Sequence, residues 1–218
     1  MNVEGFHKRL KELYLPPEKQ FTLVDVPEIR FAVIDGKGNP EGDECAEAVK
    51  WLYSVVHVIK PLVKKRMGKN FVEPPLECLV WADKKKDFME GNKDEWKWRV
   101  MVVFIDWITQ EQFEEAVAKV ELKRGPAPKT LRLENLHEGK SVQIMHVGEY
   151  SEIGAVCKKL YSEYLPANRL KPNGRYHEIY LNDPTRTAPK KRKIVIRQPV
   201  ISLSTEKATF AQGAVTAA

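Results

Sequence analysis

The chain has 218 residues, of which 43% are hydrophobic and 30% are charged, and its formal net charge is +6. These proportions are typical of a globular domain that can bury a core. The longest clearly apolar run, residues 100–105, is too short to cross a membrane, and residues 1–17 lack the apolar centre of a signal peptide. The three cysteines are widely spaced among apolar residues, which predicts reduced thiols and no disulfide. We therefore expect a cytoplasmic protein.

The chain is predicted to begin with a helix, a strand and a second, longer helix. Residues 1–20 are a charged, amphipathic N-terminal extension, expected to be helical as far as its prolines. The stretch 21–38 is rich in β-branched residues and predicts a strand or a bent strand pair. A helix then begins near Asp43, because apolar residues recur at three- and four-residue spacing: Val49, Leu52, Tyr53, Val56, Ile59 and Val63. Pro61 is expected to kink or shorten this helix.

Two strands and a capped helix follow. The strands are predicted at 75–82 and 96–107, with a charged loop between them. The helix at 109–122 opens with Thr109 and, three residues later, Gln112, the pattern of a capping box. A Gly- and Pro-containing linker then interrupts the chain.

The second half of the chain repeats this order. A strand is predicted at 140–148, and Ser151 can cap a helix with an apolar stripe. A loop at 166–174 leads to two further strands at 176–182 and 193–200.

Both halves therefore have the order strand, helix, strand, strand. This repetition predicts an α+β fold made of two pseudo-symmetric modules with antiparallel strands, at about 21–108 and 130–200, joined by the helix at 109–122. Together the modules form one ligand-binding domain over 21–200. The remainder, 201–218, has little to bury and is expected to be a flexible tail.

The most informative residue is Glu178, a carboxylate between two tyrosines. Side chains alternate across a strand, so Tyr176, Glu178 and Tyr180 share one face of the strand at 176–182. Glu77 occupies the corresponding strand of the first half, and a pseudo-twofold axis would bring both carboxylates toward one cleft. Aromatic rings around an acid suit a cationic or electron-poor ligand. The alternatives are a solvated strand residue and tyrosines that belong to the core.

Other kinds of site find little support in the sequence. There is no Walker loop, dinucleotide fingerprint, nucleophile elbow or H-E-x-x-H motif, so we expect no nucleotide or flavin cofactor. His146 and His177 have no cysteine or carboxylate at ligand spacing, so we expect no metal. The basic runs at 60–69, 83–87 and 189–193 are interpreted as solvated segments, and without a nucleic-acid-binding motif they make nucleic acid an unlikely partner.

Six segments, in one order along the chain, resemble the stand-alone GyrI-like small-molecule-binding proteins. They are VDVPEIRFAVIDGKGNP (24–40), LYSVVHVIK (52–60), PLECLVW (75–81), WKWRVMVVFIDWIT (96–109), EGKSVQIMHVGEYSE (138–152) and YHEIYLNDPTRTAPKK (176–191). The resemblance implies tandem strand-helix-strand-strand modules around a central hydrophobic cleft. It also implies binding of aromatic, amphipathic, often cationic compounds, with Glu178 as the acid of the cleft. The same fold serves as the ligand domain of multidrug-responsive transcription factors, but this chain shows no DNA-binding domain.

The resemblance also implies which residues line the cleft. Carried over one by one onto this chain, they are Tyr53, Glu77, Trp81, Trp98, His146, Tyr150, His177, Glu178 and Tyr180. Because some relatives hydrolyse cyclopropane-bearing DNA alkylators, an enzyme would use Glu178 to activate water and Tyr53 or Tyr150 as the acid. We therefore hold two hypotheses, sequestration of toxic aromatic compounds and hydrolysis of strained electrophiles. A protein partner such as gyrase is suggested only by the family's name.

Overall fold

The computed structural model describes residues 11–67, 73–104 and 106–203. Residues 11–14 of the predicted N-terminal helix are helical, and its beginning lies outside the described part. The predicted flexible tail also lies outside it from residue 204 onward. Among the described residues no helix is long and apolar enough to cross a membrane.

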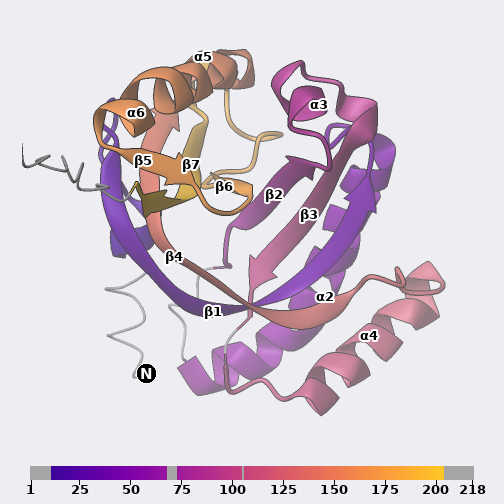
Figure 1. The fold of residues 1–218 in the computed structure, drawn as a ribbon. Coiled ribbons are helices and arrows are strands. Elements are labelled where there is room, and N and C mark those ends of the chain that lie inside the picture. Colours follow the sequence, from indigo (N-terminus) through magenta and orange to yellow (C-terminus); the bar gives the residue numbers. More distant parts are fainter. Residues whose placement is uncertain (1–10, 68–72, 105, 204–218) are drawn as a thin grey trace, which may run out of the picture.

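The fold is built on an antiparallel sheet that closes on itself (Figure 1). Its order is β4-β1-β3-β2-β6-β7, a further pairing joins β7 to β4, and β5 pairs with the last three residues of β7, beyond the part that pairs with β6. The two longest strands, β1 and β4, pair over most of their length, from Thr22 opposite Gln143 to Val33 opposite Arg132. The strands are β1 (Thr22–Lys37), β2 (Leu76–Ala82), β3 (Trp96–Val103), β4 (Arg132–Val147), β5 (Leu170–Pro172), β6 (Tyr176–Tyr180) and β7 (Lys193–Ser202).

The helices are divided between the two modules. The first module contributes α2 (Asp43–Met67) and the short α3 (Lys85–Met89), and α4 (Gln110–Arg124) connects it to the second. The second contributes α5 (Ile153–Lys159), a π-helical turn (Leu160–Tyr164) and α6 (Leu165–Ala167). Single 3-10 turns lie at Lys93–Glu95, Tyr150–Glu152 and Pro189–Lys191. The α4 helix starts as predicted, because Thr109 and Gln112 form both hydrogen bonds of a capping box.

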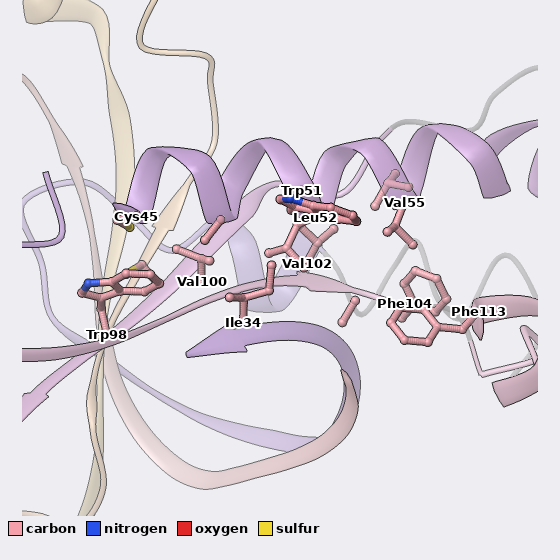
Figure 2. Packing of buried hydrophobic residues seen from close by; sticks show 14 of the residues in the cluster. Ile34, Cys45, Trp51, Leu52, Val55, Trp98, Val100, Val102, Phe104 and Phe113 are labelled. Carbon is pink, nitrogen blue, oxygen red and sulfur yellow. The ribbon is translucent and has the colours of Figure 1, made fainter. Parts of the chain in front are cut away.

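Two large hydrophobic cores lie on opposite faces of the closed sheet, and a third, smaller cluster packs the π-helical turn and α6 against the sheet: Val142, Leu160, Leu165, Leu170 and Val200. The outer core packs α2 and α4 against β1 and β3, and Figure 2 shows Trp51, Leu52 and Val55 of α2 above Ile34 and Val102. The inner core takes a residue from each of the six strands that close the sheet: Val33, Leu79, Met101, Met145, Ile179 and Val195. Leu13 and Tyr14 from the N-terminal segment complete the inner core. The two faces of each strand thus serve two different interiors.

The predicted α+β fold of two antiparallel modules is confirmed, with four differences in detail. Pro61 does not shorten α2, which continues to Met67, because Val63 beyond it is still buried in the outer core. The strand predicted at 140–148 begins at Arg132, where alternating polar residues pair with the second half of β1. The loop predicted at 166–174 contains β5, and α3 was not predicted.

Gly36 provides a test of the outer core. A β-carbon at this position would lie 2.1 Å from Cζ2 of Trp98, and the Trp98 ring is buried and enclosed. We predict that Gly36→Ala lowers the free energy of unfolding by about 2 kcal/mol, because the ring must shift in a filled core. Urea denaturation followed by circular dichroism measures the loss.

The matched control is Gly154→Ala in α5, where a new methyl group meets no atom within 4 Å. This change should leave stability unaltered or raise it by up to about 1 kcal/mol, since alanine favours helix more than glycine does. Equal stability of the Gly36→Ala protein and the wild type would contradict the packing described.

Candidate functional site

A large cleft opens over the outer face of the β2–β6 pair. Its volume is about 2180 Å³, and the side chains that line it are mainly apolar. In Figure 1, α5 and α6 stand on one side of these strands and α3 on the other. The α2 helix contributes Cys45, Val49 and Tyr53, and the strands β2 and β6 contribute Cys78, Val80, Tyr176, Glu178 and Tyr180. The cleft therefore lies between the two modules.

Glu178 is half-buried at the centre of this floor and is held by two phenols. The Tyr176 hydroxyl donates to its Oε1 at 2.8 Å, and the Tyr180 hydroxyl donates to its Oε2 at 2.5 Å. Burial and the Glu178 charge hold the pKa of both phenols well above 10, so both remain donors. The carboxylate is thus fixed in orientation by its own strand and keeps free lone pairs for a ligand.

An aromatic group adjoins Glu178 at the end of β6. The Tyr150 and Tyr180 rings meet edge to face, with centroids 5.9 Å apart. On the Tyr150 ring lies the Arg192 guanidinium, 4.7 Å from the centroid. At the other end of β6, the Arg175 guanidinium lies 3.6 Å from the centroid of the Trp81 ring. Trp81 packs against the inner core, so this second arginine–aromatic pair lies mainly on the other face of the strands from Glu178.

The three cysteines all line the cleft, which the sequence did not reveal. Burial raises the pKa of Cys45 to about 12 and of Cys157 to about 11, and it also raises the pKa of Cys78 well above its ordinary value. The three thiols are therefore protonated, and their polarisable sulfur atoms form part of the cleft wall. Cys157 donates to the Tyr176 hydroxyl at 3.5 Å. Only the pairing of Cys78 with Glu178 across β2 and β6 places Cys78 here, and periodicity within one strand does not show such a pairing.

Four of the nine residues predicted to line the cleft lie elsewhere, and Glu77 and His177 are the most instructive. Glu77 pairs with Ile179, one position away from the Cys78–Glu178 pair, so its side chain points to the inner face. His177 precedes Glu178 and also points inward by alternation. Both are completely buried. The expected meeting of two carboxylates in the cleft is therefore wrong: one is in the cleft and the other is inside the sheet.

Trp98 and His146 are the other two residues that were predicted to line the cleft and lie elsewhere. Trp98 is buried in the outer core beside Cys45 (Figure 2). The His146 ring is turned toward the 3-10 turn after β4, with Nε2 3.0 Å from the Glu149 carbonyl oxygen. The remaining five, Tyr53, Trp81, Tyr150, Glu178 and Tyr180, border the cleft.

Glu77 and His177 belong to a buried charged network on the inner face. The His177 ring lies between two carboxylates, with Nε2 3.0 Å from Glu77 and Nδ1 3.0 Å from Glu138. Arg197 donates to the other oxygen of Glu138 at 3.0 Å. The Tyr14 hydroxyl donates to Glu77 at 2.5 Å. With both ring nitrogens facing carboxylates, His177 is an imidazolium, and two positive charges balance two negative ones.

The network also attaches the N-terminal segment. Arg197 donates to the Leu13 carbonyl at 2.6 Å, and Gln143 donates to the Glu12 carbonyl at 3.3 Å. Burial alone would lower the pKa of His177, but Glu138 and Glu77 outweigh it and raise the pKa to about 9. Likewise burial would raise the pKa of Glu138, but His177 and Arg197 lower it to about 2. Across the chain as described, no group of three or more His, Cys, Asp or Glu side chains is arranged to hold a metal.

This network predicts a loss of stability at alkaline pH. An ordinary histidine has a pKa of 6.5, so the His177 imidazolium stabilises the fold fully below about pH 6.5. The contribution, about 3 kcal/mol, disappears as the pH rises through about 9. Urea denaturation from pH 6.5 to 9.5 should show this decline.

Two variants identify the responsible group. His177→Gln should be less stable at neutral pH and should lose most of the pH dependence, because no proton is left to dissociate there. His57→Gln, at an exposed histidine of α2, should keep the wild-type slope. A His177→Gln protein with the full wild-type slope would assign the effect to another residue.

The comparisons with known proteins agree with this geometry. The sequence model of the GyrI-like small molecule binding domain matches residues 19–200. A search of curated proteins found no significant match.

Three solved structures from Listeria innocua are similar over 90% of this chain and 98% of their own. An uncharacterized conserved protein is 32% identical, with a TM-score of 0.79. Two structures named as hydrolases are 32% and 31% identical, with TM-scores of 0.73 and 0.71.

Proposed function

The chain belongs to the GyrI-like family of small-molecule-binding domains, and we propose that its cleft binds and sequesters aromatic, amphipathic, often cationic compounds. The observation that carries the proposal is the position of Glu178. It is a carboxylate at the centre of a mainly apolar cleft, oriented by two phenols.

A carboxylate in such surroundings favours a positively charged ligand. No cationic side chain forms a salt bridge with Glu178 in the part of the chain described here, so its charge is balanced only by hydrogen bonds. A bound organic cation would supply the missing charge, while its aromatic parts would contact the apolar walls. Hydrogen bonds from fixed phenols keep the carboxylate in place before the ligand arrives, which lowers the cost of ordering it.

The role of Glu178 can be tested with a cationic aromatic dye. Trp81 and Trp96 border the cleft, so a bound dye should quench tryptophan fluorescence. We expect micromolar affinity, roughly −8 kcal/mol. Glu178→Gln should lower the affinity for a cationic dye about tenfold and the affinity for an uncharged dye of similar shape much less. The reason is that the change removes the charge of the side chain and keeps its size.

Glu163→Gln is the matched control, since Glu163 is an exposed carboxylate in the second module outside the cleft. This change should leave the affinity for both dyes unchanged. Equal affinity of the wild type and the Glu178→Gln protein for the cationic dye would remove Glu178 from the binding site.

A second candidate function is hydrolysis of strained electrophiles, favoured because two relatives with more than 30% identity are named as hydrolases. In this mechanism Glu178 takes a proton from a water molecule while the oxygen of that water bonds to a ring carbon of the compound. The ring C–C bond breaks, and its electrons move into a conjugated carbonyl group. Tyr150, whose ring adjoins Tyr180, then supplies a proton to that oxygen. Tyr53 is less suited, since its hydroxyl is directed to the Pro74 carbonyl at 3.4 Å.

Mass spectrometry distinguishes the two functions. An activated cyclopropane compound incubated with the protein should gain the mass of one water if the chain is a hydrolase, and Glu178→Gln should abolish the gain. Tyr150→Phe should slow it while leaving the affinity within about threefold, because the phenyl ring is kept. Unchanged compound across a panel of such substrates would leave binding as the function.

A further inference from the structure

Three aromatic rings gather at the end of the cleft floor where β6 begins. The centroid of the Phe88 ring, on α3, lies 5.3 Å from that of Trp96 and 6.1 Å from that of Tyr176. All three residues border the cleft. Trp96 is held in place because its Nε1 donates to the Asp87 carbonyl oxygen at 3.1 Å. We call these three rings the α3 compartment, and its Phe88 ring bridges the first module and the second.

A second aromatic group stands at the opposite end of the floor, where β6 ends. Tyr150 and Tyr180 meet edge to face there, and both border the cleft. Tyr53 of α2 lies at the same end, since its hydroxyl is directed to the Pro74 carbonyl oxygen at 3.4 Å. Pro74 is two residues before Leu76, which pairs with Tyr180. Tyr53, Tyr150 and Tyr180 form what we call the Tyr150 compartment.

Glu178 lies midway between the two compartments. Tyr176 and Tyr180 are two residues before and after it on the same face of β6, about 7 Å away on either side along an extended strand. On β2, Val80 and Leu76 pair with these two tyrosines and continue the floor with apolar side chains. The order along the floor is therefore aromatic, acidic, aromatic.

The other carboxylates of the cleft already have cationic partners. Among the described residues, five acidic side chains besides Glu178 border the cleft, and each forms a salt bridge: Glu41 with Lys93, Glu73 with Lys60, Asp83 with Lys97, Glu90 with Lys86 and Asp183 with Arg186. Glu178 differs from them, because its partners are the hydroxyls of Tyr176 and Tyr180. The negative charge that a ligand can balance therefore lies in the middle of the floor.

We propose that the cleft selects compounds whose positive charge lies between two aryl groups, with the charge at Glu178 and one aryl group in each compartment. The proposal rests on the function proposed above and specifies the arrangement of charge and rings in the ligand. Phe88 and Tyr150 are the specificity-determining residues, one at each end. Contacts between aromatic rings add to the affinity beyond the area that they bury. A compound with its charge at one end can fill only one compartment while that charge is at Glu178.

Two isomeric cations separate the position of the charge from size and total charge. Dimethylbis(2-phenylethyl)ammonium, the central cation, has its nitrogen between two phenyl groups. Trimethyl[4-(2-phenylethyl)benzyl]ammonium, the terminal cation, has the same composition with the nitrogen at one end. N,N-bis(2-phenylethyl)acetamide keeps both arms of the central cation and has no charge. Isothermal titration calorimetry gives the affinity of the wild type and of each variant for the three compounds.

The wild type should bind the central cation about tenfold more tightly than the terminal cation, because only the central cation fills both compartments. Phe88→Leu and Tyr150→Leu should each lower the affinity for the central cation about threefold to tenfold. Each change should lower the affinity for the terminal cation less, because that compound can use the compartment left intact. Tyr164→Leu is the matched control, since Tyr164 packs on Phe21 outside the cleft, and it should change neither affinity.

The outcomes separate the two proposals. Equal affinity of the wild type for the two isomers, or equal losses for both isomers in the two variants, overturns the arrangement of two compartments. A central cation that binds no better than the uncharged acetamide overturns the cation site at Glu178 instead. A melting temperature measured for each variant shows that a changed affinity comes from a folded protein, and the comparison of the isomers on the wild type needs no variant.

Discussion

The register between β2 and β6 is the constraint on which the rest of the site depends. Cys78 lies opposite Glu178 and faces the cleft, whereas Glu77 lies opposite Ile179 and faces the inside of the sheet. A shift of one residue would exchange the two sets of side chains. It would bury Glu178 without partners and take Glu77 away from His177 and Tyr14. The buried charges on the inner face therefore help to fix the position of the carboxylate on the outer face.

This dependence gives the inner network a role other than added stability. A buried group of charges often contributes little net free energy, because removing charges from water costs about as much as their attraction returns. Separating its members, in contrast, costs a large free energy, because it leaves a buried charge without a partner. Glu77 on β2 is paired with His177 on β6, and Glu138 on β4 joins His177 to Arg197 on β7. Any slip between these strands would leave a charge unpaired, so the network favours one alignment of both modules.

Much of the fold was predictable because local signals agreed with it. The stripe of α2, the capping box of α4 and the repeated order of elements were correctly interpreted. The assignment of faces failed for a physical reason: alternation shows which residues share a face, but pairing between distant strands decides which interior that face meets. Glu77 was matched to Glu178 by position in the repeat, and the true alignment differs by one residue. His177 was placed beside Glu178 in the cleft although alternation separates them. The cysteines were recognised as buried, but their convergence on one cleft comes from helices and strands far apart in sequence.

The arginine on Tyr150 links the two functions proposed for the cleft. Burial raises the pKa of Tyr150, Arg192 lowers it, and the Glu178 carboxylate raises it again. Arg192 thus offsets part of the effect that would make this phenol a poor acid. In a protein that only binds, the guanidinium covers one face of the Tyr150 ring and affects no proton transfer. In a hydrolase it acts on the catalytic phenol as well, so removing it would slow proton transfer. The two functions therefore make different demands on this single residue.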